Sequence, residues 1–434
     1  MKIELAYGHD GLAVDLPDSL EVHLIRKKPL PLLRNPGDAV SEALARPVAC
    51  PPLSELARGR QSACILICDI TRPVPNHLFL QPMIRELMAA GIPAHAITVL
   101  VATGLHRPNL GAELEALIGD PWVLQTVPVV NHDARNASSH IDLGRTKTRG
   151  TPVQLDRRFV EADVRIATGL VEPHFMAGYS GGRKVIAPGV AHEDTIRTFH
   201  SARFMEDPAA IQCNLEGNPL HEEQLEIVRM LGDVYALNTV IDDARRLAFV
   251  NFGAVIDSHL AAVAFAADAC TVPVERRYAT LLTSAAGYPL DSTYYQTVKG
   301  MVTPMDILAP GSNLIIAADC SEGLGSPAFR RAQQKLRAQG PEAFLAGLLS
   351  KALADVDEWQ TEMQLKPMRE SSIHLYTRGL NTADLALTGV RTTRSIAETV
   401  LASARASGDP AVAVIPEGPY VVPKLVDGRS ASAG

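Results

Sequence analysis

Three segments of the chain carry side chains that could move protons, and each follows a short apolar run. Asp69, Thr71 and Arg72 follow the first run, Thr103, Gly104 and His106 follow the second, and His174 follows the third. Histidine exchanges protons near neutral pH because its reference pKa is about 6.5. A lone loop histidine is usually structural or solvated, but two histidines and an arginine at successive strand ends bring a functional interpretation nearly level with that one.

A glycine-rich segment from Gly178 to Lys184 contains the sequence GYSGGRK. Glycines let backbone N–H groups approach an anion closely. The segment is not a Walker A loop, because Arg183 precedes the lysine and Val185 follows it. A turn with a solvated lysine is the alternative interpretation. The functional one places the Lys184 amine, ten residues after His174, near a bound electrophile.

His200 lies in TIRTFHSARF, a stretch of helical composition. A histidine on such a helix is usually a packed or surface residue. As a metal ligand it needs further donors, and no Cys, Asp or Glu cluster at ligand spacing accompanies it in the sequence. Any metal bound by His200 would therefore need distant side chains or ligands that are not protein.

In the second half, the segment after residues 278–284 offers Tyr295, Gln296 and Lys299. Gln296 and Lys299 are three residues apart and share one helical face. An amide beside an ammonium suits a carboxylate substrate, although surface pairs of this kind are common. Trp359 lies among acidic residues and could belong to a binding site or equally anchor the core.

The apolar runs that precede these side chains predict an α/β fold with mainly parallel sheets, because they alternate with helical patterns. The expected strands are 62–69, 96–104, 164–169, 278–284, 313–319, 372–377 and 411–416. Residues 220–270 are interpreted as a mostly helical bridge. We expect two α/β domains, 1–270 for cofactor binding and catalysis and 271–434 for substrate binding, facing each other across a cleft, and a short disordered tail at 428–434. Ligands of such sheets bind beyond the carboxyl ends of the strands.

Composition narrows the class of protein further. The net charge of -7 offers no basic stripe for nucleic acid. No apolar run approaches the roughly 20 residues of a membrane span, and the amino terminus lacks a signal-peptide core, so we expect a cytoplasmic protein. The six cysteines fit buried, reduced thiols better than disulfides.

Several motifs together resemble the family of nickel-pincer-nucleotide-dependent lactate racemases and related 2-hydroxyacid racemases and epimerases. The resemblance extends over nearly the whole chain, and its specificity comes from the order and number of the motifs. They are YGHDGLAVDLP, DITRP, GLHRP, PHFMAGYSGGRK, TFHSARF, YYQTVKG and IPEGPYVVP.

The resemblance implies a cofactor, the nickel-pincer nucleotide, which grips nickel through two sulfur substituents and a ring carbon. Lys184 would tether it and His200 would complete the nickel coordination, which explains a histidine without neighbouring protein ligands. Asp69, Ile70, Thr71 and Arg72 would contact cofactor and substrate. We further infer that Gly181 and Gly182 approach its phosphate. Other proteins would make and load this cofactor.

The resemblance also assigns His106 and His174 as the two acid/base residues. Racemisation needs a base on each side of the reacting carbon. One histidine would take the hydroxyl proton while hydride passes from C2 to the cofactor, and hydride would return to the opposite face of the 2-oxoacid. Arg72, Gln296 and Lys299 would hold the carboxylate, and Tyr295 and Trp359 would shape the pocket. Substrates in this family range from lactate to larger hydroxyacids.

Two alternatives remain at this point. A zinc-dependent hydrolase could use His106, His174 and His200 as three ligands, although Lys184 would then have no evident task. A non-catalytic carrier could bind the nickel nucleotide through Lys184 and His200 without needing two opposed histidines or a carboxylate clamp.

Overall fold

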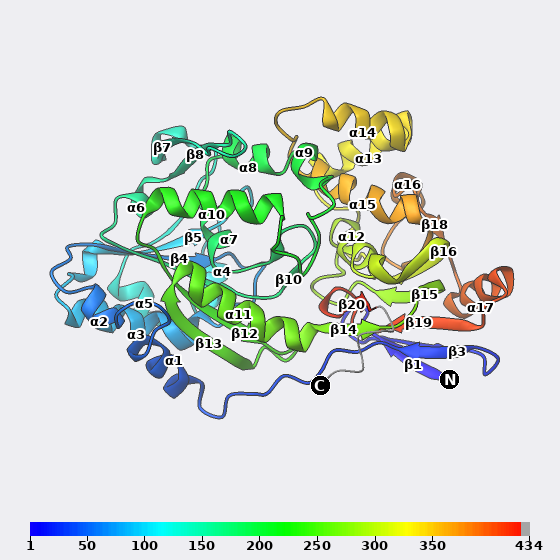
Figure 1. Ribbon diagram of the computed structural model, residues 1–434, viewed down its shortest axis with the longest axis horizontal. Helices are drawn as coiled ribbons and strands as arrows, with labels where there is room; N and C mark the ends of the chain where they lie inside the picture. Colours follow the sequence, from blue (N-terminus) through cyan, green and yellow to red (C-terminus); the bar gives the residue numbers. More distant parts are fainter. Residues whose placement is uncertain (427–434) are drawn as a thin grey trace. The chain divides into compact units, whose positions relative to one another are not determined.

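The computed structural model describes residues 1–426 and divides into two compact units (Figure 1). Unit 1 comprises residues 1–28, 200–206 and 270–426, and unit 2 comprises residues 29–199 and 207–269. Each unit is built on a six-stranded sheet. The expected α/β fold class with mainly parallel sheets is confirmed.

The sheet of unit 2 has the strand order β13-β12-β9-β4-β5-β6, and all neighbours are parallel except the β12–β13 pair. Its strands are β4 (Ala63–Cys68), β5 (Ile97–Ala102), β6 (Val129–Asn131), β9 (Val164–Leu170), β12 (Tyr235–Ile241) and β13 (Leu247–Ala254). Two small hairpins accompany it, β7 (His140–Arg145) with β8 (Pro152–Asp156), and β10 (Pro173–His174) with β11 (Gly178–Tyr179).

The α-helices of unit 2 include two long ones in the first half of the chain, two long ones in the second half, and several short ones. They are α1 (Pro36–Ala45), α2 (Leu53–Leu56), α3 (Asn76–Ala89), α4 (Ala112–Ile118), α5 (Pro121–Thr126), α6 (Arg157–Val160), α7 (Arg183–Ile186), α8 (Glu193–Phe199), α10 (Pro219–Leu231) and α11 (Val255–Cys270). Apolar residues of α1 and α3, such as Leu44 and Phe79, share a fully buried core with Ile65 and Val99 of the sheet. Because both faces of the sheet are covered, its strands read as continuous apolar runs.

The strand order of unit 2 reverses direction at β4. The chain runs outward from β4 through β5 to β6, and it then returns to place β9 on the other side of β4. Ligands of open α/β sheets bind beyond the carboxyl ends of the strands where the order reverses. Asp69 directly follows β4, and His174 follows β9. The topology therefore puts both segments at the edge where binding is expected.

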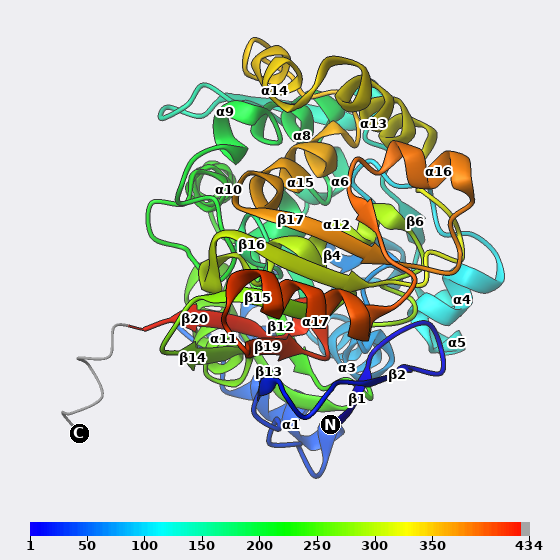
Figure 2. The same cartoon turned by 90° about the vertical axis from the view of Figure 1, so that its right-hand side faces the viewer.

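The sheet of unit 1 has the order β18-β17-β16-β15-β19-β3 with every neighbouring pair parallel (Figure 2). Its strands are β3 (Glu21–Leu24), β15 (Tyr278–Ser284), β16 (Leu308–Ala317), β17 (Ser371–Tyr376), β18 (Arg391–Thr392) and β19 (Ala411–Ile415). Two further pairs, β1 (Lys2–Leu5) with β2 (Leu12–Asp15) and β14 (Thr271–Val274) with β20 (Val422–Leu425), lie outside this sheet.

The helices of unit 1 lie against this sheet and against one another. They are α9 (Ala202–Met205), α12 (Tyr294–Val302), α13 (Pro327–Gln339), α14 (Pro341–Leu349), α15 (Glu358–Glu370), α16 (Thr382–Leu387) and α17 (Ile396–Ser407). α12 follows β15 and packs on it closely, since a Cβ on Gly300 would lie 2.7 Å from the carbonyl oxygen of Ser284. The side chains of α12 therefore have little freedom to shift relative to the strand ends.

The two compact units differ from the expected domain division in two places. Residues 1–28 belong with the C-terminal residues, because β3 pairs with β19 and Leu5 and Leu16 join the core that contains Leu282. Residues 200–206 also belong there, because Ala202 packs in a core with Leu336, Phe344 and other residues of unit 1. Sequence order alone gave no sign of these long-range contacts.

Two expected helical regions also differ. The stretch from 192 to 205 is broken, since α8 ends at Phe199 and α9 begins at Ala202, which leaves His200 in the turn between them. The middle region is not a helical bridge, because β12 and β13 form a hairpin that extends the sheet of unit 2. The tail expected at 428–434 lies outside the described residues. Among residues 1–426, no helix has the length and apolar character needed to cross a membrane.

Candidate active site

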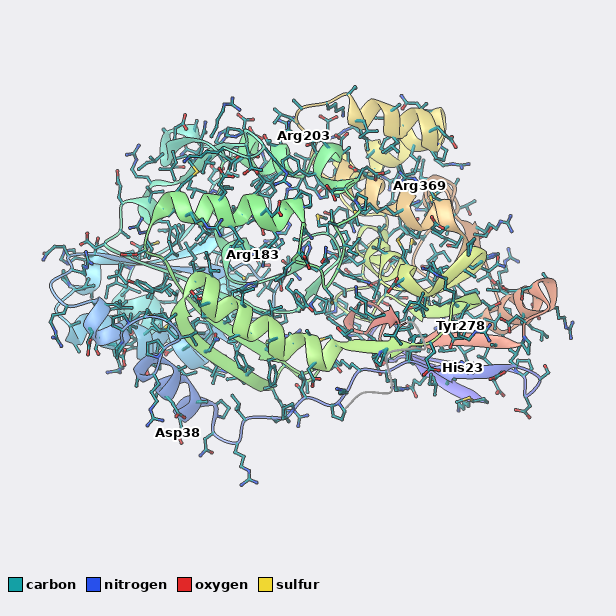
Figure 3. All side chains as sticks on the ribbon, in the orientation of Figure 1. His23, Asp38, Arg183, Arg203, Tyr278 and Arg369 are labelled. Carbon is teal, nitrogen blue, oxygen red and sulfur yellow. The ribbon has the colours of Figure 1, made fainter. Side chains whose placement is uncertain are left out.

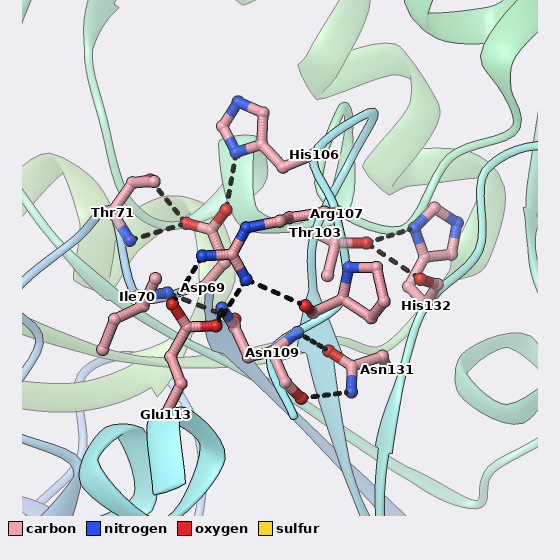
Figure 4. Close-up of polar contacts among 11 residues, drawn as sticks. Asp69, Ile70, Thr71, Thr103, His106, Arg107, Asn109, Glu113, Asn131 and His132 are labelled. Carbon is pink, nitrogen blue, oxygen red and sulfur yellow. Dashed lines mark hydrogen bonds and ion pairs between the residues drawn. The ribbon is translucent and has the colours of Figure 1, made fainter. Parts of the chain in front are cut away.

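Asp69 and His106 meet at the carboxyl edge of the unit 2 sheet (Figure 4). Nδ1 of His106 lies 2.6 Å from Oδ2 of Asp69. A carboxylate only accepts hydrogen bonds, so Nδ1 carries the hydrogen and Nε2 of the neutral ring keeps a lone pair. The His106 side chain is 61% exposed while Asp69 is buried, which leaves Nε2 accessible to a substrate. This pair is the arrangement of a general base with an orienting carboxylate.

The buried Asp69 carboxylate stays ionised because its partners outweigh the cost of burial. Burial by itself raises the pKa of Asp69, but the hydrogen bonds from His106 and Thr71 and the charge of Arg72 bring the pKa below its ordinary value. The Thr71 hydroxyl donates to Oδ1 at 2.5 Å. The anion can therefore stabilise the imidazolium that forms when His106 accepts a proton.

Hydrogen bonds to Asn109 and Asn131 hold the loop after β4 and the loop after β5 in place. The backbone N–H of Ile70 donates to Oδ1 of Asn109 at 3.3 Å, and the N–H of Asn109 donates to Oδ1 of Asn131 at 2.9 Å. The Ile70 side chain itself is exposed. The hydrogen bond of Ile70 in this network is made by its backbone. Its expected contact with a cofactor stays a prediction.

Arg72 joins the loop after β4 to the loop after β9. Its Nη1 donates to Oε1 of Glu172 at 2.6 Å, and both side chains are partly exposed. Arginine can serve two oxygen acceptors with its fork of N–H groups. Arg72 could therefore bind a substrate carboxylate, as predicted, and still keep its hydrogen bond to Glu172.

His174 differs from His106 in the way its ring is held. The backbone N–H groups of Met176 and Ala177 point at Nδ1 of His174 over 3.4 and 3.2 Å. A nitrogen that accepts hydrogen bonds carries no hydrogen, so the hydrogen of the neutral ring is on Nε2. His106 thus presents a lone pair at Nε2, whereas His174 presents an N–H there.

Lys184 lies on α7, the helix that begins directly after Gly181 and Gly182. Gly181 and Gly182 both have positive φ, and a Cβ on either would meet packed atoms, Val171 Cγ2 at 2.7 Å for Gly181 and the His259 ring at 2.7 Å for Gly182. Both glycines therefore have a packing reason to be glycine. Their approach to a cofactor phosphate stays a prediction.

In unit 1 the structure brings together His200, Trp359 and Tyr295. The rings of His200 and Trp359 have centroids 5.0 Å apart, and Nε1 of Trp359 donates to the Tyr295 hydroxyl at 3.3 Å. Burial raises the pKa of Tyr295 far above its ordinary value, so its hydroxyl remains protonated. The three side chains form one aromatic wall in which the His200 ring is buried.

Gln296 and Lys299 lie on α12, as the spacing predicted. Oε1 of Gln296 is buried and has no hydrogen-bond partner within residues 1–426. An unpaired buried amide oxygen is costly, and a ligand that hydrogen-bonds the amide group would remove this cost. The side chain therefore suits the proposed role of holding part of a substrate.

Among residues 1–426, no three His, Cys, Asp or Glu side chains are grouped so that they could hold a metal ion. The joint coordination of zinc by His106, His174 and His200, which the zinc hydrolase alternative needs, is not found in this part of the chain. Two of those histidines are in unit 2, and the third is in unit 1. A metal whose other ligands come with a cofactor would need only one protein ligand, and His200 stays the predicted one.

Sequence reasoning missed three features of the site. The side chain of Asp69, for which a contact with cofactor and substrate stays a prediction, hydrogen-bonds to His106. Glu172 pairs with Arg72, and Arg183 is buried beside Lys184. The signal for Asp69 was available, because side chains that follow neighbouring parallel strands end at the same sheet edge. The other two pairings required the tertiary structure.

Comparison with known proteins gives a consistent result. Residues 7–212 match the model of the lactate racemase N-terminal domain, and residues 275–422 match that of the lactate racemase C-terminal domain. The chain is 31% identical to the lactate racemase of Thermoanaerobacterium thermosaccharolyticum over 97% of its length and 98% of the relative. It is 32% identical to the lactate racemase of Lactiplantibacillus plantarum over 67% of its length and 68% of the relative.

Solved structures agree with this result. The lactate racemase apoprotein of Thermoanaerobacterium thermosaccharolyticum superposes with a TM-score of 0.90 at 29% identity, covering 98% of this chain and 100% of the other. A Thermotoga maritima protein shares the fold, with a TM-score of 0.68 at 16% identity and coverage of 92% and 100%. The two matched domains and the near full-length relative show that this chain belongs to the lactate racemase family and is a racemase, an enzyme of the isomerase class.

Proposed function

We propose that the protein racemises or epimerises 2-hydroxyacids, lactate or a close relative, with a nickel-pincer nucleotide as cofactor. Family membership supports a nickel cofactor, and the Asp69–His106 hydrogen bond of 2.6 Å is the observation that carries the acid–base part. When bound, the cofactor would accept hydride from C2 of the substrate and return it. Lys184 would tether the cofactor, and His200 would be the protein ligand of its nickel.

His106 would take the substrate hydroxyl proton at Nε2. The Asp69 carboxylate holds Nδ1–H of the ring and would stabilise the positive charge that results. His174 would serve the opposite side of the reacting carbon, so that a proton can be restored in either configuration. Neither role needs a metal bound to these two histidines.

Arg72, Gln296 and Lys299 would bind the substrate carboxylate. The first and third supply positive charge, and the amide of Gln296 supplies directional hydrogen bonds. The hydrogen-bonded aromatic pair Tyr295 and Trp359 would limit the size of the group attached to C2. These residues would fix the carbon that must be approached from both sides.

The test uses the protein produced in a host that makes and loads the cofactor. Intact-protein mass spectrometry, nickel and zinc analysis, and turnover of each pure enantiomer of lactate and other short 2-hydroxyacids are measured on one preparation. An adduct lost in Lys184→Ala, stoichiometric nickel and loss of optical rotation support the proposal. An adduct and nickel without turnover of any hydroxyacid would indicate a carrier, and zinc without an adduct would overturn the cofactor assignment.

A further inference from the structure

The guanidinium of Arg183 is buried in unit 2, between α10 and α11 (Figure 3). Its side chain is 1% exposed. Nε donates to Nδ1 of His221 at 2.9 Å, and Nε2 of His259 lies 2.9 Å from Nη1. Within residues 1–426 none of its partners is a carboxylate. A buried cation without an anion is costly, so an apolar side chain would serve simple packing better.

The surroundings keep the charge on Arg183 and remove it from its neighbours. Burial lowers the pKa of Arg183 to about 9, which still leaves it charged at neutral pH. Burial and the charge of Arg183 lower the pKa of His221 to about 3 and that of His259 well below its ordinary value. Both rings are therefore neutral, and His221 can accept from the guanidinium.

The remaining donors of Arg183 reach the turn that holds His174. Nη2 donates to the carbonyl of Ala177 and Nη1 donates to the carbonyl of Tyr179, both at 2.8 Å. The N–H of the same Ala177 is one of the two that point at Nδ1 of His174. Nδ2 of Asn218 holds the neighbouring carbonyl of Met176 at 3.0 Å. The carbonyl groups of the turn are thus held by Arg183 and Asn218, while two of its N–H groups face the His174 ring.

We propose that Arg183 is a positioning residue for His174, which it holds with hydrogen on Nε2 through the turn of residues 175–179. The inference rests on the proposed function only for what it means in catalysis. There, the two acid/base histidines start from opposite states, with a lone pair on Nε2 of His106 and a hydrogen on Nε2 of His174. His174 can accept a proton at Nε2 only after its hydrogen moves to Nδ1, which requires the contacts with Met176 and Ala177 to break.

The experiment reads the ring tautomer directly by long-range nitrogen NMR of histidine-labelled protein without cofactor. The signals of His174 are assigned by their loss in His174→Gln. The parent should show Nδ1 without hydrogen and Nε2 with hydrogen at pH values where the ring is neutral. Hydrogen on Nδ1 in the parent overturns the proposal without the use of any Arg183 variant. This readout does not depend on activity, so it separates failure of this inference from failure of the proposed function.

Arg183→Lys then separates geometry from charge, because the amine keeps the charge but cannot serve the separate acceptors of the guanidinium. Loss of the hydrogen bonds on the turn should shift the tautomer ratio of His174 by about fivefold or more toward hydrogen on Nδ1. Arg165→Lys is the matched control, because Arg165 also donates to a carbonyl, that of Leu231, but lies away from the turn. An unchanged ratio in folded Arg183→Lys, or an equal shift in Arg165→Lys, refutes the role of Arg183.

Steady-state rates give a second readout in the loaded enzyme. Two enantiomers have equal free energies, so kcat/KM must be the same in both directions and cannot reveal the asymmetry. In Arg183→Lys we expect kcat to fall with KM for the hydroxyacid nearly unchanged, because Arg183 does not bind substrate. A rise in KM alone would contradict a positioning role.

Discussion

The 2.6 Å hydrogen bond between Nδ1 of His106 and Oδ2 of Asp69 joins two loops that follow neighbouring strands, β5 and β4. It selects one tautomer of an exposed histidine and supplies a buried anion behind it. The same relationship makes the first prediction specific, because the carboxylate can be changed with little change of shape.

Asp69→Asn should lower kcat for racemisation on the order of 10²-fold or more. The amide can turn its NH₂ group toward Nδ1 and favour the tautomer that has its hydrogen on Nε2, where the base must be. Rates and bound nickel are measured on the same loaded preparation. Thr71→Val is the control, since it removes one hydrogen bond to Asp69 but keeps the carboxylate. Equal losses in both variants would show that loop order, rather than the tautomer, is what matters.

His106→Gln and His174→Gln should each block full racemisation, with a loss on the order of 10²-fold or more. A complete turnover needs one base to take the proton and another to return one. Single-turnover absorbance measurements on loaded protein should show opposite preferences for the two enantiomers. The adduct mass is checked first, so that a loss of cofactor is not mistaken for a loss of catalysis. Near-normal racemisation by both variants would exclude the two-base mechanism.

Lys184→Ala should abolish the covalent adduct, and His200→Ala should reduce nickel content while the fold is retained. Lys184→Arg should not restore the adduct, because a guanidinium is a much poorer nucleophile than an amine. Intact mass, nickel analysis and circular dichroism are measured for each variant. Stoichiometric nickel together with full activity in both alanine variants would show that the cofactor assignment is wrong.

Stability should fall as the pH drops below about 6.5. Burial, more than any neighbouring charge, lowers the pKa of His132 to about 4 and that of His221 to about 3. The unfolded chain protonates these rings near pH 6.5, so acid favours unfolding at about 1.4 kcal/mol per pH unit for each histidine until the folded pKa is reached. Urea unfolding at pH 7 and pH 5 measures this slope.

The slope should be shallower in His132→Asn and unchanged in His95→Gln, because the ring of His132 is buried and that of His95 is exposed. A stability that stays constant between pH 7 and pH 5 would mean that the buried rings take up protons in the folded state.

Gly182→Ala should destabilise the protein without cofactor by about 1–3 kcal/mol, since its Cβ would lie 2.7 Å from the His259 ring. Gly59→Ala is the matched control, because Gly59 also has a positive φ but no atom within 4 Å of the added Cβ. Thermal unfolding compares the two variants. If both lose the same stability, backbone strain explains the glycine and the contact with His259 does not.

The sequence by itself determined the α/β class and most of the elements of the second half. The apolar run 278–284 became β15 with the same bounds, and the patterns at 220–231 and 327–340 became α10 and α13 within one residue. These features are local, since strand and helix periods are written into adjacent residues. The motif order also identified the family, because many spaced residues agreed at once.

Only the tertiary structure decided which side chains act together. The placement of residues 1–28 and of His200 with the C-terminal residues depends on contacts between segments far apart in the sequence. The tautomers of His106 and His174 depend on Asp69 and on the backbone of a turn, and no residue type encodes them. A neutral histidine can present either a lone pair or an N–H at Nε2. The hydrogen bond that its Nδ1 makes decides which of the two it presents.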